Sequence, residues 1–232
     1  MKKKLTAIFL CVALVAIAIV GASLAYFTDT DQATNTFAVG NVKIELIEQQ
    51  RGENGLVPFE QNKKLYPIVG SAQGDKDEYG MPIAKNYVDK MVTIKNTGSE
   101  KAYIRAYFAI PSALDDAGMN VLHFNFGNKV VDGNVISTYD VEWNWKHGNK
   151  WNYFETTIDD IKYNVYFADY YQPVDANATT EQFVQGVYLD KTFDIKDGKC
   201  YAFGKEVTLD DGWDWNSVSC PVFAIACQAE GF

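Results

Sequence analysis

Short alternating segments, rather than any helical repeat, dominate most of this sequence and restrict the fold that it can adopt. Residues 37–49 set Val39, Val42, Ile44 and Leu46 between polar neighbours, which is the period-two pattern of a half-buried strand. Similar segments follow along the chain, separated by turn signals, and none has the 3.6-residue period of an amphipathic helix. The sequence therefore predicts an all-β fold, a two-sheet sandwich of the jelly-roll or immunoglobulin-like type.

Two β-hairpins are predicted within this fold. Residues 88–111 contain two alternating strands on either side of the turn signal at 96–99. Residues 143–154 contain two aromatic strands joined by Gly148-Asn149, a pair suited to a two-residue turn.

Other segments predict the middle and the end of the domain. Residues 161–171 are a long aromatic strand, and residues 220–232 are a continuous apolar strand, typical of a strand buried in the middle of a sheet. Residues 51–87 interrupt the pattern with Gly and Pro and predict an irregular insertion. We expect residues 26–232 to form a single sandwich domain.

The first 25 residues have the features of a secretory signal peptide. Lys2–Lys4 precede an almost wholly apolar run over residues 5–20, and small residues two positions apart end the segment. We expect a signal peptidase to cut between Ala25 and Tyr26. An uncleaved membrane anchor is the alternative, because the apolar run approaches the length needed to span a bilayer.

The charge of the mature chain restricts its partners. Cleavage would remove three of the 21 basic residues and none of the 30 acidic ones, so the formal net charge would fall from −9 to −12. A surface this acidic repels phosphate backbones and anionic lipid, so we expect no nucleic-acid partner and no membrane contact after cleavage. A chain of this length needs no cofactor for stability, and we expect a secreted protein.

Three cysteines remain after cleavage, namely Cys200, Cys220 and Cys227. An odd number cannot form a complete disulfide framework. Cys220 and Cys227 would face opposite sides of one strand and are poor partners for each other. Buried free thiols are the favoured interpretation, and one bond from Cys200 to either of the others is the alternative.

The junction between the leader and the first strand resembles a known family. The leader runs directly into "AYFTDT", then "NTF", Gly40 and the alternating strand, which resembles the SipW-dependent exported proteins of the TasA and camelysin family of biofilm-matrix proteins. Residues 224–232, "AIACQAEGF", resemble the last strand of many proteins exported with this type of signal. The resemblance covers the two ends of the chain and the segment around residues 92–111.

This resemblance implies an extracellular structural subunit that assembles into matrix or cell-surface fibres with itself or a related subunit. Its N-terminal segment would then fill a strand position in a neighbouring subunit, with Tyr26, Phe27 and Phe37 in the donor strand and Gly40 allowing a bend into the fold. The alternative is that residues 26–37 fold back on their own domain as an ordinary first strand.

The tryptophans suggest a different function, a carbohydrate-binding or adhesive module. Trp143 and Trp145 share one strand face, and Trp213 and Trp215 have the same spacing. A row of exposed aromatic rings could stack on the sugars of a cell-surface glycan. The alternative is that these rings fill the space between the sheets. In the second hairpin Trp143 would lie opposite Phe154.

Catalytic signatures are sparse. A zinc peptidase needs two histidines four residues apart on a helix with a glutamate between them, whereas His123 and His147 are far apart in strand or turn segments. A metal-dependent peptidase is therefore the weakest of three hypotheses, and we predict a non-enzyme. Asp75 and Asp77 begin like a calcium loop, but the fifth position is Tyr79 and the twelfth is Asn86 rather than Glu, and a solvated acidic loop is favoured.

Overall fold

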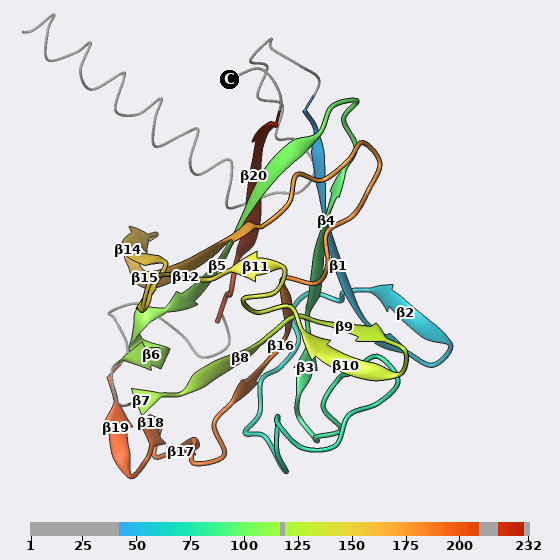
Figure 1. Ribbon diagram of the computed structural model, residues 1–232. Helices are drawn as coiled ribbons and strands as arrows, with labels where there is room; N and C mark the ends of the chain where they lie inside the picture. The colour runs from blue at the N-terminus through green and yellow to red at the C-terminus, as the bar shows by residue number, and fades with distance from the viewer. Residues whose placement is uncertain (1–41, 117–118, 209–217, 230–232) are drawn as a thin grey trace, which may run out of the picture. The chain divides into compact units, whose positions relative to one another are not determined.

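Every sheet in the computed structural model is antiparallel (Figure 1). The structure describes residues 42–116, 119–208 and 218–229, all within one compact unit that spans residues 39–232. The only helix among the described residues is the short 3-10 helix η1 (Ser112–Leu114). The predicted all-β class is confirmed.

The first layer is a five-stranded sheet built around β5 (Ala102–Pro111). On one side of β5 lies β15 (Ile161–Tyr170), which also pairs with β11 (Trp143–Asn144) and β14 (Tyr153–Ile158). On the other side lies β20 (Val222–Gln228), drawn in dark red beside the green β5 in Figure 1. Apolar residues alternate inward along β5, namely Ala102, Ile104, Ala106, Phe108 and Ile110, which suits a central strand.

The second layer begins with a three-stranded sheet. β1 (Ile44–Gly52) lies between β2 (Gly55–Pro58) and β4 (Met91–Asn96). The far edge of β4 is hydrogen-bonded to residues 177–183, for example from Phe183 N to Val92 O at 2.8 Å.

That segment leads into β16 (Val184–Leu189), which lies between β3 (Val88–Asp89) and β8 (Leu122–Phe126). The second layer is therefore continuous from β2 to β8.

A hydrophobic core fills the space between the two layers. Its fully buried side chains come from β4, β5, β8, β11 and β16, so both layers contribute to it. The largest fully buried side chains of this core are Trp143, Trp145, Phe108, Phe183, Ile94, Ile104, Ile110, Leu114, Leu122 and Leu189. Two apolar faces packed in this way form a β-sandwich.

Small sheets lie outside the two layers. They are formed by β6 (Asp115–Asp116) with β7 (Met119–Asn120), β9 (Asn128–Val131) with β10 (Asn134–Ser137), β12 (Lys146–His147) with β13 (Lys150–Trp151), and β17 (Asp194–Lys196), β18 (Lys199–Ala202) and β19 (Lys205–Val207).

The prediction of a hairpin over residues 88–111 is wrong. Residues 88–111 do form two long strands, but β4 pairs with β1 in one layer and β5 pairs with β15 and β20 in the other. The connection is thus an arch between layers. The buried Asn96 holds it, because its Nδ2 donates to Glu100 O at 2.7 Å and Val174 O at 2.9 Å, while its Oδ1 accepts from Gly98 N at 3.0 Å.

The second predicted hairpin is confirmed only at its tip. Lys146 pairs with Trp151 around the Gly148-Asn149 turn, as expected. Farther along, Trp143 pairs with Tyr170 of β15 instead of Phe154, so the prediction for that pair is wrong. The hairpin splits because β11 and β14, on its two sides, both pair with the longer strand β15.

The irregular segment is shorter than predicted. Residues 51–58 belong to the hairpin of β1 and β2, whereas residues 59–87 form only isolated bridges among loops. A small separate cluster that includes Ile68, Met81 and Tyr87 packs these loops.

Candidate functional site

The outer edge of β20 is the most unusual feature of the larger sheet. β20 pairs with β5 along its whole length, and no other strand in the described part of the chain pairs with its opposite edge. The sequence predicted a strand buried in the middle of a sheet, so that prediction is wrong for the described residues. An apolar edge of this kind is normally paired or covered.

The pairing of β20 with β5 determines which backbone N–H and C=O groups of β20 point to the open edge. Backbone bonds from Ala109 N to Pro221 O and from Ala229 N to Lys101 O show that odd-numbered residues turn toward β5. In an antiparallel pair the alternate residues turn the other way. The N–H and C=O groups directed at the open edge therefore belong to the even-numbered residues Val222, Ala224, Ala226 and Gln228.

The side chains of these even-numbered residues point into the sandwich. Val222, Ala224 and Ala226 pack partly buried against the main core. Oε1 of Gln228 is buried and has no hydrogen-bond partner among the described residues. The edge thus combines backbone groups, apolar side chains and one unsatisfied acceptor.

A shallow groove of about 380 Å³ adjoins this edge on the outer face of the sheet. Its lining comes from β5, β15 and β20, and includes Tyr103 and Ile225, whose exposed fractions are 48% and 42%. Arg105 at its side forms an ion pair with Asp169, with Nε 2.6 Å from Oδ1. The groove is mostly apolar with one charged pair at its margin.

The described chain enters the fold near the same margin. Lys43 O accepts hydrogen bonds from Thr97 N at 2.7 Å and Gly98 N at 3.0 Å, which ties the start of β1 to the arch. Residues of β1 and β20 approach within 8 Å of each other without pairing. β1, the first strand of the described chain, therefore lies close to β20.

The residues predicted for cleavage and strand donation, Ala25, Tyr26, Phe27, Phe37 and Gly40, lie outside the described residues. Trp213 and Trp215 also lie outside them.

The tryptophan hypothesis is wrong for Trp143 and Trp145. Both side chains are 0% exposed and belong to the core. Trp145 stacks on Phe183 with centroids 4.4 Å apart, and Trp143 Nε1 donates to Glu181 O at 3.1 Å. No sugar can reach either ring, because the second layer covers that face of the sheet.

The exposed aromatic rings are different ones. Trp151 and Tyr153 are 41% and 49% exposed, and both contact Tyr166. The sequence prediction did not select these two rings. The available signal was the Gly148-Asn149 turn, because Trp151 follows it by two residues, close to the tip of the hairpin.

The metal hypotheses find little support in the side-chain geometry. His123 stacks on Tyr188, with Nε2 3.5 Å from Asp190 Oδ2, and His147 lies exposed beside the hairpin turn. Within the described residues, no three His, Cys, Asp or Glu side chains gather to hold a metal ion.

The acidic loop has a structural role at Asp77. Its Oδ1 accepts from Tyr79 N and Met81 N, and its Oδ2 lies 2.7 Å from Arg51 Nη1. These donors occupy both carboxylate oxygens, and a cation already lies beside them. The calcium alternative at Asp75 and Asp77 is therefore contradicted at Asp77.

The cysteines lie in three environments. Cys200 is buried in the core, and Cys220 and Cys227 are free thiols on opposite faces, as the spacing predicted. Burial raises the pKa of the Cys220 thiol to about 12, so this thiol is unreactive at neutral pH. Cys227 is exposed at the end of β20.

Comparisons with protein-family models, with curated proteins and with solved structures found no match for this chain. Among the residues that the structure describes, no helix has the length and apolar character to cross a membrane.

Proposed function

We propose that this protein is a secreted structural subunit of extracellular fibres, and that it assembles by donating residues 26–37 to the open edge of β20 in a neighbouring subunit. The TasA and camelysin resemblance of the leader and first strand supports this proposal. The leader and the acidic composition support export to the extracellular matrix or the cell surface.

The observation that carries the proposal is the character of β20. Soluble proteins protect an edge strand with charged side chains, proline or a covering segment. The seven residues of β20, Val222–Gln228, contain neither a charged residue nor a proline. Such a segment is prone to pair with another strand, and an exported protein needs a specific partner for it.

Residues 26–37 could form such a partner strand, with the following contributions to the free energy of pairing. Five backbone hydrogen bonds at about 1 kcal/mol each would stabilise the added strand by several kcal/mol. Burial of Phe27 and Phe37 would add about 1.5–3 kcal/mol for each ring. Ordering the strand opposes these gains at about 1–2 kcal/mol per residue, so assembly should depend on concentration.

Cleavage after Ala25 would control this step. Before cleavage, Tyr26 is continuous with the leader and cannot act as a free strand end. Export would therefore precede assembly.

The alternative is that residues 26–37 occupy the edge of their own subunit. Chain entry near the same margin makes such closure geometrically feasible. The two arrangements use the same edge but differ in whether the pairing joins two chains.

Disulfide trapping separates the two arrangements. One copy carries one added cysteine, at residue 28, 29, 30 or 31, together with Cys227→Ser. A second copy with a different tag retains Cys227 and has no added cysteine. Opposite residues in paired strands have Cβ atoms about 4.5–5.5 Å apart, close enough for a disulfide after small adjustment.

Strand donation predicts disulfides between the two tagged copies at alternate donor positions only, because alternate side chains share the outer face with Cys227. A second chain that carries both cysteines tests closure within one molecule. Exclusive formation of that internal disulfide would refute donation between subunits.

A further inference from the structure

The groove beside the open edge of β20 has room for one large side chain. We define the edge groove by its outward side chains, namely Tyr103, Arg105, Asp169, Ile225 and Cys227. We propose that the edge groove binds the side chain of Phe27 from the strand that a neighbouring subunit donates, and that it thereby selects an aromatic donor residue. This inference rests on the proposed strand donation and identifies the part of the donor that is recognised.

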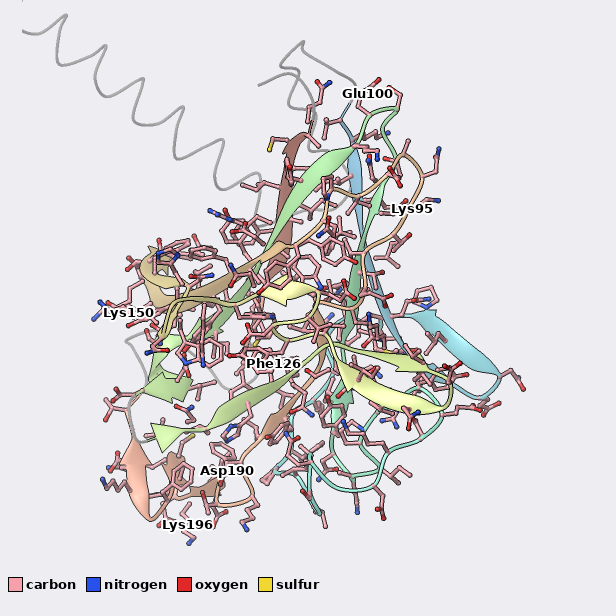
Figure 2. The ribbon with its side chains drawn as sticks, in the orientation of Figure 1. Lys95, Glu100, Phe126, Lys150, Asp190 and Lys196 are labelled. Carbon is pink, nitrogen blue, oxygen red and sulfur yellow. The ribbon has the colours of Figure 1, made fainter. Side chains whose placement is uncertain are left out.

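The edge groove lies on the outer face of the five-stranded sheet. Ile104 and Ala106 of β5 point into the sandwich and are 2% and 0% exposed, so the odd-numbered residues of β5 point outward. The partners of these residues on β15 and β20 share the same face. In Figure 2 the labelled Glu100 lies just before β5, at the end of the sheet where β5 begins and β20 ends, and the edge groove lies near this end.

Two rows of side chains form the edge groove. Asp169, Arg105 and Ile225 lie side by side on β15, β5 and β20 in the first row, and Tyr103 and Cys227 are paired in the second row. Cys227 is the smallest of these five side chains, so the wall between the groove and the open edge is lowest there. The volume of about 380 Å³ is near the lower end of the range for pockets that hold a whole small molecule, about 300–1,000 Å³, and suits a single large side chain.

The contacts available in the edge groove are mostly apolar. Arg105 donates twice to Asp169, from Nε to Oδ1 at 2.6 Å and from Nη2 to Oδ2 at 2.9 Å, and its Cζ lies 4.7 Å from the centroid of the Phe167 ring. Both charged groups are thus already partnered, so a charged side chain would gain little there. Tyr103 and Ile225 are 48% and 42% exposed, and an apolar side chain placed against them would bury apolar surface of both partners.

The donor sequence puts Phe27 on the same outer face. Phe27, Asp29 and Asp31 occupy alternate positions, so their side chains point to one side of an extended strand, while Tyr26 and Thr28 point to the other. A strand paired with β20 has one side toward the core and one toward solvent. Carboxylates enter an apolar core only at a large cost, so the side that carries Asp29 and Asp31 is the outer one. Phe27 therefore lies on the face that carries the edge groove.

The Phe27 ring can reach the groove from the donated strand. Opposite residues in paired strands have Cβ atoms about 4.5–5.5 Å apart, and diagonal neighbours about 7–8 Å apart are still within reach of an aromatic ring. A Phe27 ring opposite or diagonal to Cys227 can therefore lie across this small side chain and contact Tyr103, the partner of Cys227 on β5. Aromatic pairs are favourable at centroid separations of about 4.5–7 Å.

Such a site gives β20 a selectivity that its backbone lacks. In strand addition the main-chain hydrogen bonds provide affinity, and pockets for alternate side chains provide specificity. The edge of Val222–Gln228 offers main-chain groups and no charged side chain. The edge groove is therefore the element that distinguishes the donor from other extended segments.

The test measures the critical concentration for fibre formation by the mature chain beginning at Tyr26, with sedimentation and negative-stain microscopy. Phe27→Ala and Tyr103→Ala should each raise this concentration about tenfold or more, because each removes one of the two rings that meet in the groove. The double variant should resemble Phe27→Ala, since both substitutions remove the same contact. Phe27→Tyr keeps the ring and should assemble at nearly the unmodified concentration.

Two matched controls separate the site from general effects. Tyr66→Ala removes a ring that is 53% exposed in the irregular loops, and it should leave the critical concentration unchanged. Phe27→Thr combined with Thr28→Phe keeps the composition of the donor but turns the ring to the other side of the strand, so this exchange variant should assemble as poorly as Phe27→Ala. Circular dichroism confirms that each variant is folded.

Failure of the groove and failure of strand donation give different results. If the unmodified chain forms no fibres, strand donation is refuted and this inference with it. If the unmodified chain forms fibres but Phe27→Ala, Tyr103→Ala or the exchange variant assembles at the same concentration, donation stands and the edge groove is not the binding site. Additive losses in the double variant would show that the two rings do not meet.

Discussion

Arg51 and Asp89 are joined by two hydrogen bonds, from Nη2 to Oδ1 at 2.7 Å and from Nε to Oδ2 at 2.8 Å. The same guanidinium donates through Nη1 to Asp77 Oδ2 at 2.7 Å and to Pro82 O at 3.3 Å. One side chain of β1 thereby ties the irregular loops over residues 59–87 to the sheet. These loops have only a small apolar cluster of their own, so they depend on polar anchors, of which this network is one and the bonds from Asn128 Nδ2 and Gln185 Nε2 to Gly80 O are others.

Arg51→Lys should destabilise the protein by about 2 kcal/mol, since an ammonium group cannot form the two-point bond and leaves partly buried acceptors unpaired. Urea denaturation measures the change. Lys196→Gln is the control, because Lys196 forms an exposed pair with Asp194 and surface pairs contribute little. Equal effects of the two substitutions would contradict the anchoring role.

Asn96 should be essential to the arch between the two layers. Asn96→Asp removes both donor hydrogens and adds a charge at a site that is 0% exposed, so the expected loss is about 3 kcal/mol or more. Thermal and urea unfolding report the loss. Asn134→Asp, at the exposed start of β10, should be nearly neutral, and comparable losses at both positions would count against the arch.

Trp145→Ala should cost about 3–5 kcal/mol, because the ring is fully buried against Phe183. Trp151→Ala should cost about 1 kcal/mol, because that ring is partly exposed. Chemical denaturation of the two variants side by side makes the comparison. A smaller loss of stability for Trp145→Ala than for Trp151→Ala would contradict the burial of Trp145 in the core.

Stability should fall as the pH rises above about 10. Burial, followed by the charge of Asp89, raises the pKa of Tyr87, and burial likewise raises the pKa values of Tyr166 and Tyr188. In the unfolded chain these phenols lose their protons near pH 10, while the folded protein keeps them, so the unfolded state binds fewer protons and is favoured by alkali.

Urea denaturation between about pH 8 and about pH 11 measures this effect. Tyr87→Phe should reduce the alkaline loss, and the exposed control Tyr66→Phe should leave it unchanged. A stability that is constant across this range would show that the burial of these phenols has no energetic consequence.

Several features of the fold were predictable from local pattern alone. The all-β class, the long strand over residues 161–171 and the Gly148-Asn149 turn follow from period-two alternation and turn chemistry, which act within a few residues. The partners of β4 and β5 were not predictable in this way. Two alternating strands joined by a turn signal fit a hairpin and an arch equally well, and the arch follows from long-range pairing of β4 with β1 and of β5 with β15 and β20.

The candidate site was only partly predictable. The apolar run at residues 220–232 indicates a strand with neighbours on both sides, but composition cannot say which strand supplies each neighbour. β5 supplies one of them, and the other edge is the open one. For Trp143 and Trp145, spacing predicted a shared face, and their burial depends on the second layer, which lies far away in the sequence.

The most direct test of strand donation compares two versions of the mature protein, one beginning at Tyr26 and one beginning at Asn41. Size-exclusion chromatography with light scattering and negative-stain microscopy follow both over a range of concentrations. Strand donation predicts fibres from the Tyr26 version and folded monomers from the Asn41 version. If both versions remain folded monomers up to millimolar concentration, the proposal that this protein assembles through its N-terminal strand is wrong.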